Sequence, residues 1–120
     1  MIRISGPATR ELVRRMTGAL PRNRTPTTTA LALPAGSLPV SVCYFEGPRS
    51  YTGEDVAEVQ LPGNPLLVER VLKAMAAVPF VRPARPGEFT ARAFLNGKLP
   101  LEEAEAIAAK INAETDDQLH

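Results

Sequence analysis

The chain has 120 residues, 44 % of them hydrophobic and 22 % charged, with one cysteine, one histidine and 14 basic against 13 acidic side chains. This composition suits a single domain with its own core, whereas one cysteine excludes an internal disulfide framework and, with one histidine, cannot form a structural zinc site. No apolar run reaches the roughly 20 residues of a membrane span, so we expect a cytoplasmic protein that does not bind membranes. A net charge of +1 argues against a broad phosphate-binding surface, so we expect no direct binding of nucleic acid.

The first twenty residues predict a short strand and a helix. Residues 2–4 alternate in hydropathy as a strand does, and Ser5-Gly6-Pro7 then turns the chain. Pro7 suits the first turn of a helix, and Gly18 is a natural helix end. Between them, four apolar side chains fall on one helical face: Ala8, Leu12, Val13 and Met16.

The middle of the chain predicts a β-hairpin and one further strand. Residues 28–33 and 38–45 are β-like and are separated by a short turn that contains proline and glycine. A loop over residues 46–53 follows, and the next strand is expected over residues 55–61. Cys43, beside aromatic residues in the second hairpin strand, is expected to be a small core or half-buried residue.

The last part of the chain predicts mainly helices. One helix opens at Asn64-Pro65 and runs to about residue 77, and a short strand begins at Phe80-Val81. A short helix lies within residues 86–97, and a final helix covers about residues 100–118, with an apolar stripe of Leu101, Ala104, Ala108 and Ile111. The order β-α-β-β-β-α-β-α-α predicts an α+β fold in which helices pack on a mixed β-sheet.

The charges are unevenly distributed along the chain. Residues 1–30 hold six arginines and one acid, whereas residues 99–120 hold six acids and one lysine. Three interpretations of this distribution are open. The opposite charges attract the two ends of the domain to each other, they attract two copies of the chain, or they belong to two unrelated, solvated helix faces.

No self-contained active site is visible in the sequence, so whether the chain is an enzyme stays open. The phosphate-binding Gly-x-x-x-x-Gly-Lys-Ser/Thr loop and the Gly-x-Gly-x-x-Gly fingerprint are both missing from it. The one histidine is the last residue, which makes a rigid catalytic triad improbable. The sequence therefore predicts no catalytic residue and no metal site.

Three segments carry a resemblance to a known family. They are RISGP at residues 3–7, SYTGEDVAEVQ at residues 50–60 and RPGEFTARAFLNGKL at residues 85–99. Together they closely resemble the N-terminal domain of the MnmE family, also called TrmE, of bacterial GTPases that modify tRNA wobble uridines. The similarity covers nearly the whole chain, so residues 1–120 are expected to form one such domain, whose final helix would lead into a helical domain that is absent here.

The resemblance implies a tetrahydrofolate-binding and homodimer-forming module, similar to folate-dependent aminomethyltransferase domains. Its cofactor would be 5-formyltetrahydrofolate or another tetrahydrofolate, bound near the dimer interface as a one-carbon donor. A MnmG-type flavoprotein and tRNA would be partners only in the full system. Three family ligand contacts correspond to Arg3 of RISG, Glu58 of TGEDV-x-E and Lys98 of FLN-x-K.

These residue types suit a folate. One carboxylate, such as that of Glu58, can accept the paired amino and ring N–H donors of a pterin edge. Arg3 and Lys98 are suitable counter-charges for the carboxylates of the glutamate tail. Apolar walls for the rings are expected from aromatic residues near the motifs: Tyr51, Phe89 and Phe94.

The sequence departs from the family at several places. The usual opening strand and Pro-Gly-Arg-Gly loop before RISG are missing, and Leu61-Pro62-Gly63-Asn64-Pro65 stands where the family usually has Gly-His-Gly-Gly-Pro. Pro100 replaces the Asp that typically caps the last helix, and the GTPase domain is absent. These departures keep two alternatives open, a non-catalytic assembly module that has lost folate binding and, with less support, a stand-alone one-carbon transferase.

Overall fold

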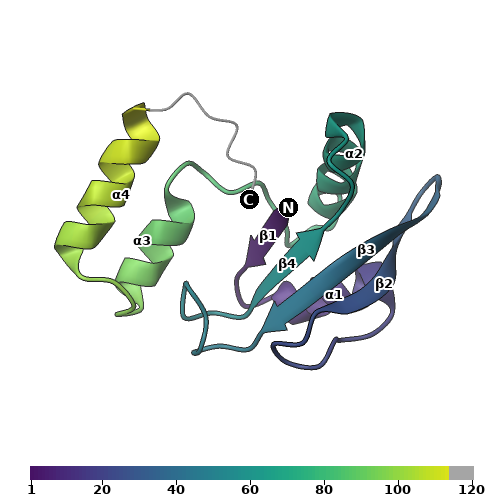
Figure 1. Ribbon diagram of the computed structural model, residues 1–120, viewed down its shortest axis with the longest axis horizontal. Helices are drawn as coiled ribbons and strands as arrows, with labels where there is room; N and C mark the ends of the chain where they lie inside the picture. Colours follow the sequence, from purple (N-terminus) through teal and green to yellow (C-terminus); the bar gives the residue numbers. More distant parts are fainter. Residues whose placement is uncertain (114–120) are drawn as a thin grey trace.

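A four-stranded sheet and four helices make up the fold. The computed structural model describes the backbone of residues 1–113 and the side chains of residues 1–110. Its elements follow in chain order (Figure 1): β1 (Ile2–Ser5), α1 (Thr9–Thr17), β2 (Thr27–Leu33), β3 (Gly36–Phe45), β4 (Val56–Gln60), α2 (Pro65–Ala76), α3 (Glu88–Leu95) and α4 (Leu101–Ala113). The predicted α+β class is therefore confirmed.

The sheet is antiparallel, with strand order β1-β4-β3-β2. All three strand pairs run antiparallel, so the prediction of a mixed sheet is wrong; the one parallel contact among the described residues is an isolated bridge between Asn23 and Tyr44. The strand predicted at residues 80–81 does not form. Residues 78–81 instead make a turn, in which Val81 N donates to the carbonyl of Val78 (3.0 Å). Prolines at positions 79 and 83 lack the N–H that a sheet pairing needs.

The two faces of the sheet have different roles, because alternate residues of each strand point to opposite sides. One row across the sheet joins Ile2, Val59 and Val42, all buried in the core with residues of α1 and α2. The neighbouring row joins Arg3, Glu58 and Cys43, which are half-buried on the other face. The helices α1 and α2 thus cover one face, and the polar row lies on the opposite one.

The two helices of the core follow the sequence pattern closely. In α1, Leu12, Val13 and Met16 are buried as predicted, and the helix ends at Gly18 in the left-handed conformation (φ 86°). In α2, the side chain of Asn64 accepts a hydrogen bond from Leu66 N (2.9 Å), which satisfies one of the free N–H groups at the helix start.

The loop between β3 and β4 is held tightly against α3. A side chain on Gly47 would meet the backbone of residues 53 and 54 at 2.9 Å, and one on Gly53 (φ 81°) would meet Cβ of Asn96 at 2.9 Å. Asn96 Nδ2 also donates to the carbonyl of the buried Thr52 (2.8 Å). This close approach fixes the end of α3 against the loop between β3 and β4.

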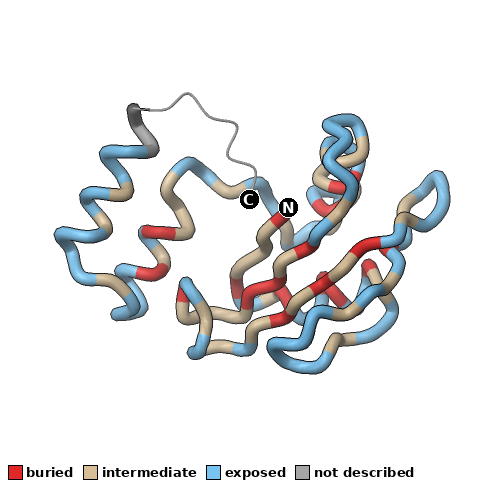
Figure 2. The backbone as a smooth tube through the Cα atoms, viewed as in Figure 1, coloured by how far each residue is buried: buried red, intermediate tan, exposed pale blue. Residues whose placement is uncertain are grey.

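The last helix packs on α3 and is otherwise mostly exposed (Figure 2). Its predicted apolar stripe is not buried: Leu101 and Ala108 are exposed, Ala104 is half-buried, and the side chain of Ile111 lies outside the described residues, as does any continuation of the helix to residue 118. Within residues 1–110, no ion pair joins the arginines of the first 30 residues to an acid of α4. No helix in the described part of the chain is long and apolar enough to cross a membrane.

Candidate functional site

Arg3 and Glu58 form an ion pair on the open face of the sheet. They are direct partners in the β1–β4 register, and two nitrogens of the guanidinium contact the same carboxylate oxygen, Nε at 3.2 Å and Nη2 at 3.1 Å from Oε2. Both side chains keep about a third of their surface exposed, at 34 % and 28 %. Among the described residues Oε1 of Glu58 has no hydrogen-bond donor, so the carboxylate can still accept bonds from a ligand.

A cavity of about 400 Å³ lies over this pair. Its lining comes from β1, β4, the end of β3 and the adjoining loops: Arg3, Arg24, Phe45, Arg49, Ser50, Tyr51, Val56, Glu58 and Lys98. We call this space the site cavity. The three residues predicted to bind folate are thus brought together, although they come from distant parts of the chain.

Lys98 reaches the site cavity through the local structure after α3. The sequence Asn96-Gly97-Lys98 ends the helix in a Schellman motif, in which Gly97 N donates to Phe94 O (3.0 Å) and Lys98 N to Ala93 O (2.8 Å). Gly97 has the positive φ (72°) that this motif requires. The Lys98 ammonium then donates to the carbonyl of Pro48 (3.0 Å), which lies in the loop between β3 and β4.

Two arginines that the sequence did not indicate, Arg24 and Arg49, also line the site cavity. Arg24 has a left-handed backbone (φ 61°) and its N–H donates to Tyr44 O (2.7 Å). Its guanidinium lies 5.5 Å from the ring centre of Phe45 and donates to the carbonyl of Arg49. The placement of Arg24 depends on these tertiary contacts, and no spacing signal in the proline-rich loop indicates it.

The predicted aromatic walls are only partly in this cavity. Tyr51 lines it and its hydroxyl is 3.1 Å from the hydroxyl of Thr90, while Phe45 supplies a ring that was not predicted. Phe89 instead lines a second cavity, and Phe94, on the exposed side of α3, lines neither. In this structure, therefore, only Tyr51 of the three predicted aromatic residues lies beside Glu58.

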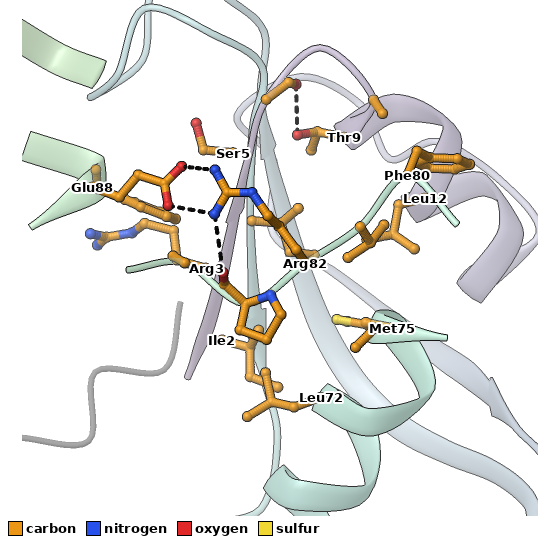
Figure 3. Close-up of a pocket in the computed structure, with 18 of the residues that line it drawn as sticks. Ile2, Arg3, Ser5, Thr9, Leu12, Leu72, Met75, Phe80, Arg82 and Glu88 are labelled. Atoms are coloured by element: carbon orange, nitrogen blue, oxygen red, sulfur yellow. Dashed lines mark hydrogen bonds and ion pairs between the residues drawn. The ribbon is translucent and has the colours of Figure 1, made fainter. Parts of the chain in front are cut away.

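The second cavity has about 390 Å³ and lies between β1, α1, α2 and residues 80–84 (Figure 3). Its floor is apolar, with Leu12, Leu72 and Met75 labelled in the figure. At its edge the Arg82 guanidinium donates two hydrogen bonds to the Glu88 carboxylate, from Nη1 to Oε1 (2.8 Å) and from Nη2 to Oε2 (2.6 Å). Arg3 lines both cavities, so the second one adjoins the site cavity.

The acids near the second cavity are fully engaged in ion pairs. Arg92 bridges α3 to the preceding loop, since it contacts Glu88 (2.8 Å) and both oxygens of Glu54 (2.9 and 3.0 Å). Hydrogen bonds from Arg82, opposed by burial and aided by Arg85 N and Arg92, lower the pKa of Glu88 to about 2. A carboxylate with so low a pKa is a poor proton carrier near neutral pH, so this cluster is structural.

Within residues 1–110, the remaining titratable groups with shifted pKa values form no acid–base pair. Burial, with a hydrogen bond to Asp55, raises the pKa of the Tyr44 phenol. Burial and the charge of Glu58 raise the pKa of the Cys43 thiol, which makes it less nucleophilic. The described residues contain no group of three or more His, Cys, Asp and Glu side chains that could hold a metal ion. The site is therefore suited to binding a ligand that has both donors and negative charge.

Comparison with known sequences decides the family. The profile described as GTP-binding protein TrmE N-terminus matches residues 1–98. The chain belongs to the MnmE/TrmE family. It is 45 % identical over 120 residues to the tRNA modification GTPase MnmE of Mesorhizobium japonicum, a match that covers 98 % of this chain and 27 % of the relative.

Mitochondrial members of the MnmE/TrmE family are similar to the chain as well. The 5-taurinomethyluridine-[tRNA] synthase subunit GTPB3 is 45 % identical over 123 residues in Homo sapiens and 43 % over 121 residues in Danio rerio. Each match covers 98 % of this chain but only 25 % and 24 % of the relative. The chain thus spans about a quarter of the length of the curated relatives it matches.

The unusual segment 61–65 lies away from the site cavity. None of these residues, all within the described part of the chain, contributes to the lining around Glu58. Leu61 packs against the core, and Asn64-Pro65 begins α2. This departure from the MnmE/TrmE pattern therefore leaves the lining of the cavity intact.

Proposed function

We propose that this MnmE/TrmE domain binds a tetrahydrofolate, such as 5-formyltetrahydrofolate, in the site cavity. The observation that carries the proposal is the meeting of Arg3, Glu58 and Lys98 around one space of about 400 Å³, a size typical of small-molecule sites. In the sequence the three positions lie far apart, and only the family resemblance connects them. Their convergence supports a common ligand.

Each residue has a distinct part in this proposal. The Glu58 carboxylate accepts the paired N–H donors of the pterin edge, because Oε1 is free and Oε2 has remaining acceptor capacity. Arg3, which contacts Oε2, acts as a positioning residue that holds this carboxylate in place. Lys98 provides a positive charge for the glutamate tail, and Tyr51 and Phe45 provide aromatic surface for the rings.

A role in tRNA modification is supported by the names of the relatives, which describe tRNA modification GTPases and a tRNA-modifying synthase subunit. We propose that the bound folate supplies a one-carbon unit for modification of the tRNA wobble uridine, with a MnmG-type flavoprotein as partner. The chain itself contains no phosphate-binding Gly-x-x-x-x-Gly-Lys-Ser/Thr loop. GTP hydrolysis would therefore depend on parts of the system other than these 120 residues. We also propose that two copies of the domain associate as a homodimer.

Isothermal titration with 5-formyltetrahydrofolate tests the ligand. The wild-type chain should bind with a dissociation constant in the micromolar range, and Glu58→Gln should weaken binding by about tenfold to a hundredfold, because one acceptor becomes a donor that faces the pterin N–H groups. Glu69→Gln is the matched control, since Glu69 is exposed on α2 and lies outside both cavities. Equal affinity of wild type and Glu58→Gln would contradict the assigned pterin contact.

The second candidate function is an assembly module without a ligand. The mutual neutralisation of Arg3 and Glu58 favours it, because neither charge needs a ligand to be compensated. A folded wild-type chain that forms dimers but gives no heat with 5-formyltetrahydrofolate would support this candidate over the first.

A further inference from the structure

Three cationic side chains of the site cavity lack an acidic partner. Arg3, Arg24, Arg49 and Lys98 line the cavity with a single carboxylate, that of Glu58. Of these four cations, only Arg3 lies within salt-bridge distance of an acid in the described part of the chain. Arg24, Arg49 and Lys98 are exposed and come from loops, whereas Arg3 and Glu58 belong to strands of the sheet. The loop side of the cavity is therefore strongly positive.

The three charges gather around one short piece of loop. Lys98 donates to the carbonyl of Pro48, and Arg24 donates to the carbonyl of the next residue, Arg49. Consecutive Cα atoms are only about 3.8 Å apart, so the ammonium and the guanidinium approach the same stretch of backbone. The side chain of Arg49 starts from that stretch too.

The proximity of three cations without an acidic partner needs a physical explanation. Like charges in proximity repel, and backbone carbonyls offset this only in part, so the arrangement costs stability in the free protein. Residues that break a rule of stability in this way are typical of functional sites. The contact of Arg24 with Phe45 orients its planar guanidinium, whose fork of N–H donors suits carboxylates. The expected ligand group therefore carries several carboxylates.

We propose that Arg24, Arg49 and Lys98 form a subsite for a γ-linked oligoglutamate tail, and that the domain prefers polyglutamylated tetrahydrofolates to monoglutamates. The proposal rests on the folate binding proposed above and adds a specificity to it. A monoglutamate tail carries two carboxylates, and each further γ-glutamyl residue adds one. A triglutamate thus offers a partner to every unpaired cation, and the exposed position of the three side chains leaves room for the tail to extend toward solvent.

The test compares two ligands and three variants by isothermal titration at low salt. The wild-type chain should bind 5-formyltetrahydrofolate triglutamate about tenfold more tightly than the monoglutamate, and Arg49→Gln should reduce this ratio to about threefold or less. Arg49 is suited to the test because its exposed side chain makes no hydrogen bond or ion pair within the described residues, so its loss should not unfold the chain. Arg24→Gln should lower the ratio as well. Arg70→Gln on α2, outside both cavities, should leave it unchanged.

The outcomes separate the two proposals. Equal affinities of the wild-type chain for both ligands, or a ratio that neither Arg49→Gln nor Arg24→Gln changes, would overturn the tail subsite while folate binding stands. Absence of binding for both ligands would overturn folate binding and the subsite together. A wild-type preference that disappears at high salt and falls in both arginine variants would support the subsite, because contacts between exposed charges are screened.

Discussion

Asp55 is the residue that ties the start of β4 to its surroundings. Its carboxylate accepts hydrogen bonds from the hydroxyl of the buried Tyr44 and from Gly47 N (2.8 Å). Its carbonyl accepts from Thr9 Oγ1 (3.0 Å) and Gly6 N (3.2 Å) at the start of α1. One residue thus connects the strand β3, the loop after it and the first helix.

Replacement of this carboxylate should be costly. Asp55→Ala leaves the Tyr44 hydroxyl and the Gly47 N–H without their acceptor, and we expect the free energy of unfolding to fall by about 2–3 kcal/mol. Tyr44→Phe removes the hydrogen bond from the phenol to Asp55 but leaves the Gly47 contact in place, and should lower the free energy of unfolding by about 1 kcal/mol. Urea denaturation measures both, with Glu46→Ala, an exposed residue with one weak ion pair, as the control. Equal losses for Asp55→Ala and Glu46→Ala would contradict this account.

The low pKa of Glu88 predicts a specific weakness in acid. The pKa is about 2 in the folded chain, chiefly because Arg82 donates hydrogen bonds to the carboxylate, and its ordinary value is 4.5. A carboxyl whose pKa is lower in the folded state stabilises the fold above the ordinary pKa, and this contribution is lost as the pH falls from 4.5 towards 2. Because Arg82 is largely exposed, we expect the contribution to be about 1–2 kcal/mol.

Urea denaturation at a series of pH values tests this weakness. Glu88→Gln should already lack this stabilisation near neutral pH, and the difference from wild type should shrink towards pH 2. The control Glu69→Gln should follow the wild-type curve throughout, since no ion pair in the described structure involves its exposed carboxylate. A constant difference between wild type and Glu88→Gln over the whole range would argue against the low pKa.

At the residue scale, the sequence predicted part of the site. Family motifs pointed to Arg3, Glu58 and Lys98, and the structure brings them to one cavity, although their ligand stays a prediction. Arg24 was missed because its position depends on a left-handed backbone and on contact with Phe45, neither of which leaves a pattern in the sequence. The ion pair of Arg3 with Glu58 was also missed, because the β1–β4 register is a long-range property.

At the scale of elements, the position of α3 controls one side of the site cavity. Gly53 allows the loop to approach Asn96, and the turn after α3 then places Lys98 at Pro48. Gly53→Ala forces a Cβ to within 2.9 Å of Asn96 Cβ at a φ of 81°. We expect a loss of about 1–3 kcal/mol in the free energy of unfolding, together with weaker binding of 5-formyltetrahydrofolate as Lys98 is displaced.

Gly63→Ala is the matched control for this element. A Cβ at Gly63 meets no atom within 4 Å, so both the free energy of unfolding, measured by urea denaturation, and the affinity for 5-formyltetrahydrofolate should stay at the wild-type values. If Gly53→Ala behaved like Gly63→Ala in both measurements, the docking of α3 through this loop would not have the role assigned to it.

The elements themselves were predictable where local chemistry decides them. The apolar face of α1, the helix end at Gly18 and the helix start at Asn64 depend on residues close in the chain, and all three were found from the sequence. The strand at residues 80–81 and the mixed sheet were wrong, because two apolar residues between prolines carry no information about sheet pairing. The stripe on α4 was equally misleading, since a helical pattern shows that a face is apolar but not what covers it.

At the scale of the whole molecule, α3 and α4 lie side by side at one end of the fold (Figure 1). Several large apolar side chains of these two helices are exposed. Leu95 is 79 % exposed, Leu101 52 % and Phe94 37 %. Large apolar side chains that are grouped on a surface are typical of contact regions, whereas single ones are common anywhere. We therefore expect the proposed homodimer to bury this α3–α4 surface.

Sedimentation equilibrium of the chain and two variants tests this expectation. Leu95→Asp places a charge within the expected contact and should weaken dimer formation by about tenfold or more, since a buried unpaired charge costs well over 1.4 kcal/mol. Leu66→Asp is the control, because Leu66 on α2 is similarly exposed, at 65 %, but lies on another element. If both variants dimerised as the wild type does, the interface would lie elsewhere, and a monomeric wild type would contradict the homodimer itself. A selective loss in Leu95→Asp would instead identify α3 as the helix that joins the two copies. Because the turn after the same helix places Lys98 at the site cavity, ligand binding and association would then be physically coupled through α3.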